Sequence, residues 1–89
     1  MDVVSDERLV EQYVETGEIR WFNELVSKHI GKVRAMIYAM VLNDADADEL
    51  TQEVFLRVSN HIVAFRRESK FSTWLYRICM NTTRSFLRS

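Results

Sequence analysis

Three aspartates at alternate positions form the first group in the chain whose spacing could bind a metal ion. Asp44, Asp46 and Asp48 would supply oxygens at the first, third and fifth positions of a twelve-residue calcium loop. That loop also needs glycine at its sixth position and glutamate at its twelfth, where this chain has Glu49 and Phe55. We therefore expect no metal and no cofactor here. We interpret the aspartates as a loop and a helix start, with Asp46 or Asp48 as the N-cap residue.

Capping does not explain the polar residues that follow on the same predicted helix. Helical spacing places one set on a face that we expect to be buried: Leu50, Val54, Val58, His61, Ile62 and Phe65. The opposite face would carry Glu49, Gln52, Glu53, Leu56, Ser59 and Val63. This second face is either a solvated surface with isolated apolar residues or a protein-docking face with a small apolar centre and an acidic rim.

The segment "TWLYRICMNTTRSFLRS" carries side chains suited to binding nucleic acid. If Ser72 caps a helix there, its apolar side would carry Leu75, Ile78, Cys79, Thr82 and Phe86. The opposite side would carry Trp74, Arg77, Asn81, Arg84 and Arg88. Guanidinium groups bind phosphate, an indole stacks on a base and an asparagine can read a base edge. A solvated, arginine-rich face with a packed tryptophan is the other interpretation.

The distribution of charge supports two different partners. The net charge is −1, but residues 1–53 hold 5 basic and 12 acidic residues, whereas residues 54–89 hold 7 basic and 1 acidic residue. The basic part suits phosphates. We interpret Cys79 as a core residue, and His29 and His61 have no cysteine at zinc-ligand spacing. No nucleophile grouping or glycine-rich phosphate loop indicates an enzyme.

The chain of 89 residues, with no proline and a helical hydrophobic pattern throughout, predicts one compact all-α domain. A first helix would run from about Asp6, a possible N-cap, to Gly17, and a second from about Ile19 to Leu42. The expected buried stripe of the second comprises Ile19, Phe22, Val26, His29, Ile30, Val33, Ile37, Met40 and Val41. Gly31, inside it, indicates either close packing or simple tolerance.

The N-terminus has no signal-peptide pattern, and the lone cysteine cannot form an internal disulfide. The longest apolar run, Ala35 to Leu42, has eight residues, whereas a membrane span needs about 20. We therefore expect a cytoplasmic protein with no membrane insertion.

The motifs "DELTQEVF" and "FSTWLYRI", followed by "NTTRSFLR", resemble region 2 of bacterial sigma factors, in particular the extracytoplasmic-function (ECF) class of the sigma-70 superfamily. The resemblance covers about Asp6 to Arg88, with region 2.1 at about 6–42, region 2.2 at about 46–65 and regions 2.3 and 2.4 at about 66–89. It implies a four-helix promoter-recognition subunit of RNA polymerase, not an enzyme. The family's second domain, region 4, is absent from this chain, so we expect a piece of a longer protein.

The resemblance also implies two sets of site residues. The set expected to dock on the beta-prime clamp coiled coil of the core polymerase is Asp48, Glu49, Gln52, Glu53, Leu56 and Ser59. The set expected to bind the minus-ten promoter element is Arg66, Arg67, Lys70, Trp74, Tyr76, Arg77, Asn81, Arg84 and Arg88. One flipped base of the non-template strand would lie near Asn81, and an anti-sigma factor would be a further partner. The alternatives are a helical protein-interaction module that does not bind DNA, and a helical RNA-binding domain.

Overall fold

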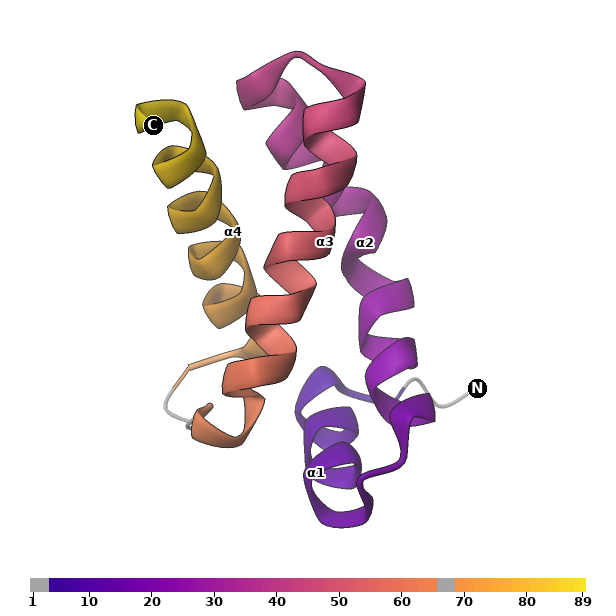
Figure 1. Ribbon diagram of the computed structural model, residues 1–89. Coiled ribbons are helices and arrows are strands. Elements are labelled where there is room, and N and C mark those ends of the chain that lie inside the picture. The colour runs from indigo at the N-terminus through magenta and orange to yellow at the C-terminus, as the bar shows by residue number, and fades with distance from the viewer. Residues whose placement is uncertain (1–3, 66–68) are drawn as a thin grey trace.

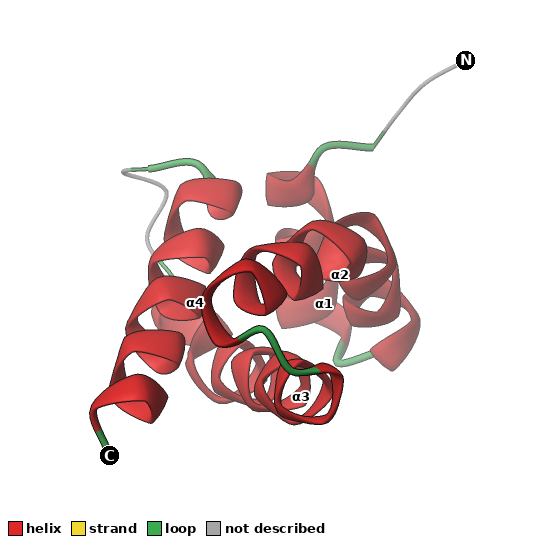
Figure 2. Ribbon diagram, turned by 90° about the horizontal axis from the view of Figure 1, so that it is seen from above, coloured by secondary structure: helices red, strands yellow, loops and turns green. Residues whose placement is uncertain are grey.

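The computed structural model describes residues 4–65 and 69–89, and these residues form four α-helices and one short 3-10 helix. The elements are α1 (Asp6–Thr16), α2 (Ile19–Val41), α3 (Asp44–His61), η1 (Ile62–Ala64) and α4 (Phe71–Arg88). The long helix α3 packs against both α2 and α4, and α1 closes one end of the bundle (Figure 1). Seen from above, α2, α3 and α4 surround a common interior (Figure 2). The expected all-α, four-helix fold is confirmed.

The first two helices have the boundaries that the sequence predicts, except for the first cap. Ser5, not Asp6, is the N-cap residue of α1, because its hydroxyl oxygen accepts a hydrogen bond of 3.1 Å from the backbone N–H of Arg8. Asp6 instead lies in the first turn, where a carboxylate interacts favourably with the helix dipole. Gly17 ends α1 in the left-handed conformation, with φ of 70°.

The helix α3 begins earlier than expected. The side chain of Asn43 accepts a hydrogen bond of 2.9 Å from the backbone N–H of Asp46, so Asn43 is the N-cap residue rather than Asp46 or Asp48. All three aspartates therefore have helical backbone, and Asp44 and Asp46 lie in the first turn. This conformation differs from the wrapped loop that coordinates calcium.

The helix α4 begins at Phe71, one residue before the expected cap Ser72. Lys70 occupies the N-cap position and offers no capping side chain. The Oε2 atom of Glu7, on α1, instead accepts a hydrogen bond of 2.8 Å from the backbone N–H of Phe71. One of the free N–H groups at the start of α4 is thus bonded by a residue distant in sequence.

The core lies between the helices and includes Leu9, Leu25, Val33, Ile37, Val54, Val58, Ile62, Phe71, Leu75 and Cys79. Four expected core residues are exposed instead: Ile19 (58%), Ile30 (43%), His61 and Phe86 (38%). Ile19 is exposed as the first residue of α2, and His61 as the last residue of α3, directly before the 3-10 helix η1. Ile30 and Phe86 line grooves on the surface.

Gly31 is tolerated in α2 and is not required for close packing, because a Cβ atom placed there would meet no heavy atom within 4 Å. Within the described part of the chain, no helix is both long and apolar enough for a membrane span.

Candidate protein and nucleic-acid interfaces

The residues expected to bind a protein partner lie on the exposed side of α3. Asp48, Glu49, Gln52 and Glu53 are exposed, Ser59 is half-buried, and Leu56 is 60% exposed. The core side of α3 is held by Leu50, Val54 and Val58, as the helical pattern predicts. Phe55 and Thr51 are also buried, although the sequence pattern did not include them. An exposed leucine in the middle of a polar face is consistent with a docking surface.

Two of the acidic residues on this face already have partners within the fold. The guanidinium group of Arg34, on α2, donates from Nε to Asp48 (2.7 Å) and from Nη2 to Asp44 (2.9 Å). These hydrogen bonds raise the pKa of Arg34 above its ordinary value. Glu53 accepts a hydrogen bond of 3.1 Å from Arg57, one turn along α3. Ion pairing within the fold therefore accounts for acids that capping left unexplained.

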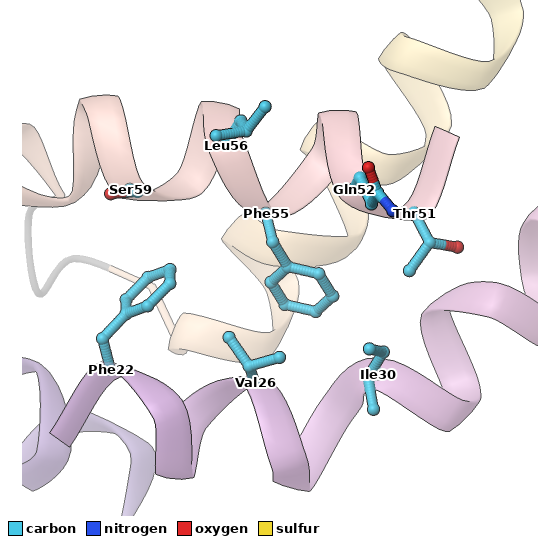
Figure 3. Close-up of a pocket in the computed structure, with 8 residues that line it drawn as sticks. All are labelled: Phe22, Val26, Ile30, Thr51, Gln52, Phe55, Leu56 and Ser59. Carbon is cyan, nitrogen blue, oxygen red and sulfur yellow. The ribbon is translucent and has the colours of Figure 1, made fainter. Parts of the chain in front are cut away.

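A groove of about 400 Å³ separates α2 from the exposed side of α3. Its lining residues are Phe22, Val26, Ile30, Thr51, Gln52, Phe55, Leu56 and Ser59. In Figure 3 the ring of Phe55 points from α3 towards α2, whereas Leu56 points away from α2. The α2 residues of this groove were not expected to take part in a binding surface, because their helical spacing indicated only a buried stripe.

A second hollow, of about 460 Å³, lies on the other side of the same exposed residues, between α3 and α4. Gln52 and Leu56 line both hollows, and Glu49 and Glu53 line the second. The exposed side of α3 is therefore a ridge, which we call the α3 ridge, defined by Glu49, Gln52, Glu53 and Leu56. A ridge with a hollow on each side suits a helical partner, whose side chains can pack into such hollows.

The predicted basic face of α4 is present and exposed. Arg77, Asn81, Arg84 and Arg88 lie on the side opposite the buried Leu75, Cys79 and Thr82. Among residues 4–65 and 69–89, none of these three arginines forms an ion pair with a carboxylate, and neither does Lys70 at the N-cap. Cationic groups without internal partners are available to bind phosphate. The expected contacts Arg66 and Arg67 lie outside the described residues.

The two aromatic residues of this face are less free than the sequence predicts. Trp74 is half-buried, and its ring centroid lies 5.2 Å from that of Phe65 and 5.8 Å from that of Phe71. Tyr76 is also half-buried, and its hydroxyl oxygen lies 3.2 Å from Nδ1 of His29. Trp74 and Tyr76 therefore each present part of a ring, held in place by the fold.

A polar network beneath Tyr76 joins three helices. The Nε2 atom of His29, on α2, lies 2.9 Å from Oδ2 of Asp6, on α1, and Nζ of Lys28 lies 2.7 Å from Oδ1 of Asp6. Burial raises the pKa of Asp6, but the hydrogen bonds from Lys28 and His29 outweigh that effect and leave the pKa below its ordinary value. Burial also raises the pKa of Tyr76. The network fixes the position of Tyr76 on α4 relative to α1 and α2.

Cys79 lies on the buried face of α4, as expected. Burial raises the pKa of its thiol, which keeps the group protonated and unreactive at neutral pH.

Comparison with known proteins shows similarity over almost the whole chain. Residues 25–89 match the family model "Sigma-70 region 2". The chain is 39% identical to the ECF RNA polymerase sigma-E factor of Haemophilus influenzae over 84 aligned residues. The aligned segment covers 94% of this chain and 43% of that protein. It is 38% identical to the RNA polymerase sigma-H factor of Pseudomonas aeruginosa over 82 aligned residues, and this segment covers 92% of this chain and 42% of that protein. The chain thus spans less than half the length of these relatives.

A solved structure with the same arrangement of helices is an NMR structure described as the complex formed by an engineered region 2 of sigmaE with GTAAAA. The TM-score is 0.86 and the sequence identity is 35%, with 98% of this chain and 90% of that chain covered. That engineered domain therefore has this fold and binds GTAAAA.

Proposed function

Because the chain belongs to the sigma-70 region 2 family, within the ECF group of sigma factors, we propose that it binds core RNA polymerase and recognises the minus-ten promoter element. The observation that carries the proposal is the face of α4, where Asn81 and three arginines without ion-pair partners among the described residues lie opposite the buried side. Sigma factors are initiation factors and not enzymes. A helical module that leaves DNA unbound is not favoured by the comparisons.

We propose that α4 binds the non-template strand of the opened minus-ten element. Arg77, Arg84 and Arg88 would contact phosphates, and Asn81 would read a flipped base. Trp74, about two turns before Asn81 on α4, would offer its ring to another base of the strand. Flipping a base costs a few kcal/mol of unstacking, which is offset by pocket contacts and by phosphate contacts along the strand. Lys70 lies at the N-cap of α4 and would contact the same strand.

The α3 ridge is the proposed docking surface for the coiled coil of the beta-prime clamp. Leu56 would supply the apolar centre, and Glu49 and Gln52 the polar contacts, because Asp48 and Glu53 are already engaged by Arg34 and Arg57. Ser59 would lie at the edge of this surface, in the groove between α2 and α3. An exposed leucine flanked by carboxylates suits a helical partner with basic residues around an apolar contact.

The remaining parts of the proposal concern the intact protein. We assign region 2.1 to about residues 6–42, region 2.2 to about 46–65 and regions 2.3 and 2.4 to about 66–89. A separate region 4 domain would read the minus-thirty-five element, an anti-sigma factor would regulate binding, and the protein would act in the cytoplasm.

The two surfaces can be separated by mutation. The double substitution Gln52→Ala with Leu56→Ala should strongly reduce retention of core polymerase in a pull-down, and should leave binding of a labelled single-stranded oligonucleotide containing GTAAAA unchanged. Arg84→Ala should instead weaken binding of the oligonucleotide and leave retention of core polymerase unchanged. Val63→Ala is the control for loss of an exposed aliphatic side chain and should leave polymerase retention unchanged. Helical spacing placed Val63 on the same face as Leu56, but it lies on η1, after the end of α3 and outside the α3 ridge. Undiminished polymerase retention by the double variant would refute the docking assignment.

A further inference from the structure

The helix α2 carries one cationic side chain whose charge the fold does not neutralise. Within residues 4–65 and 69–89, Lys32 has no carboxylate partner. Its neighbours on α2 are both held: Lys28 lies 2.7 Å from an oxygen of Asp6, and Arg34 lies 2.7 Å from an oxygen of Asp48. The Nζ atom of Lys32 instead lies over the ring of Tyr76, 5.3 Å from its centroid. An exposed ammonium group on an aromatic face remains able to bind an anion.

The lysines and arginines among residues 4–65 and 69–89 fall into two sets, according to whether a carboxylate pairs with them, and the two sets lie in different places. Those paired with a carboxylate are Arg8, Arg20, Lys28, Arg34 and Arg57. Those without such a partner in the described ranges are Lys32, Lys70, Arg77, Arg84 and Arg88. Four of the second set lie on α4 or at its N-cap. Lys32 is distant from them in sequence but contacts α4 through Tyr76, so the available positive charge continues from α4 onto α2.

Tyr76 is a fixed support for Lys32. Its hydroxyl group is hydrogen-bonded to Nδ1 of His29, whose other ring nitrogen is held by Asp6. The rings of His29 and Tyr76 meet edge to face, with centroids 6.0 Å apart. Tyr76 therefore cannot turn away without breaking this network. Arg77 follows Tyr76 directly on α4 and lies about 100° further round the helix axis, so the side of α4 that carries Tyr76 borders the side that carries Arg77.

We propose that Lys32 is a further nucleic-acid contact, in which its ammonium group binds a backbone phosphate of the strand held on α4, so that the strand crosses from α4 onto α2. This inference rests on the proposed function, since it needs a strand on α4. A lysine acts on phosphate as a point charge and carries no base preference. Its contribution should therefore be independent of sequence and sensitive to salt.

The test is the salt dependence of binding to a fluorescein-labelled single-stranded DNA oligonucleotide containing GTAAAA, measured by anisotropy between about 50 and 200 mM KCl. Loss of one phosphate contact reduces the slope of log K against log[salt] by about 0.7 for single strands. Lys32→Gln should show that reduction on this oligonucleotide and on a scrambled one, and Lys32→Arg should restore the slope.

Two further variants make the result decisive. Arg20→Gln is the matched control, because Arg20 also lies over an aromatic ring, 4.5 Å from the centroid of Trp21, but at the first turn of α2. It should leave the slope unchanged, and an equal reduction in Arg20→Gln and Lys32→Gln would overturn the inference. Arg77→Gln reports on the proposed function. If it reduces the slope and Lys32→Gln does not, the inference about Lys32 fails alone. If the wild-type chain does not bind the oligonucleotide, both fail.

Discussion

The carboxylate of Glu7 accepts a hydrogen bond from the backbone N–H of Phe71, with 2.8 Å between Oε2 and N, and so joins the first helix to the start of the last one. The N-cap residue Lys70 offers no side-chain acceptor to the first turn of α4. The start of α4 lies beside Trp74 and Lys70, which belong to the proposed DNA-binding surface. The helix α1 therefore helps to position that surface, although it carries none of the expected DNA contacts.

Removal of this carboxylate should destabilise the domain. Glu7→Ala leaves the backbone N–H of Phe71 without its acceptor, and loss of such a capping bond costs about 0.5–2 kcal/mol in the free energy of unfolding. Urea denaturation followed by circular dichroism measures the change. Glu15→Ala, an exposed position on the same helix, is the control and should change the free energy by less than about 0.5 kcal/mol. Equal effects of the two substitutions would contradict the capping role.

The network around Asp6 predicts how stability depends on pH. Because the pKa of Asp6 is lower in the folded protein than in the unfolded chain, its contribution is complete above the ordinary aspartate pKa of about 4 and is lost as the pH falls through the folded value. The free energy of unfolding should therefore fall more steeply below about pH 4 in the wild type than in Asp6→Asn. Urea titrations of both proteins measure this difference. A difference that stays constant from about pH 7 to pH 2 would exclude the effect.

The helices were predictable because their signals are local. The spacing of apolar residues predicted both boundaries of α1 and of α2 to within one residue, and Gly17 marked the end of α1. The same spacing separated the buried Leu75 and Cys79 from the exposed Arg77 and Arg84. A helical period indicates which side chains share a face, and one buried face is enough to orient a helix.

The contacts between helices were not predictable from local pattern. Nothing near Phe71 indicates that Glu7 will cap its N–H, and nothing near Asp48 indicates that Arg34 will bind it. The same limit applies to Tyr76, because its bond to His29 depends on how α2 and α4 pack. These features depend on tertiary geometry.

The two glycines of the chain should respond in opposite directions to substitution by alanine. An added Cβ meets no heavy atom within 4 Å at either position, so backbone conformation decides the outcome. Gly31 lies inside α2 at an exposed position, and Gly31→Ala should stabilise the protein by about 0.5–1 kcal/mol through helix propensity. Gly17 has φ of 70°, so Gly17→Ala should destabilise it by about 1 kcal/mol. Thermal unfolding of both variants checks the signs, and two changes of the same sign would refute this explanation.

Asn81 and Arg84 should affect DNA binding in different ways. Arg84→Ala removes the proposed phosphate contact and should weaken binding to all single-stranded sequences by a similar factor. Asn81→Ala removes a group that can read a base edge, which is worth about 1–3 kcal/mol of discrimination, and should mainly reduce preference at one position. Competition binding with oligonucleotides that each carry one substituted base distinguishes the two. Identical profiles for both variants would argue against base reading at Asn81.

If this chain selects single-stranded promoter DNA through α4, as we propose, an anisotropy titration will show the preference directly. A labelled single-stranded oligonucleotide containing GTAAAA is titrated with the purified chain, in parallel with its complementary strand and with the RNA of the same sequence. The GTAAAA strand should bind at least about tenfold more tightly than either, a difference of about 1.4 kcal/mol, and this preference should decrease in Asn81→Ala. Equal affinity for all three strands, or no binding of the GTAAAA strand, would contradict the proposal.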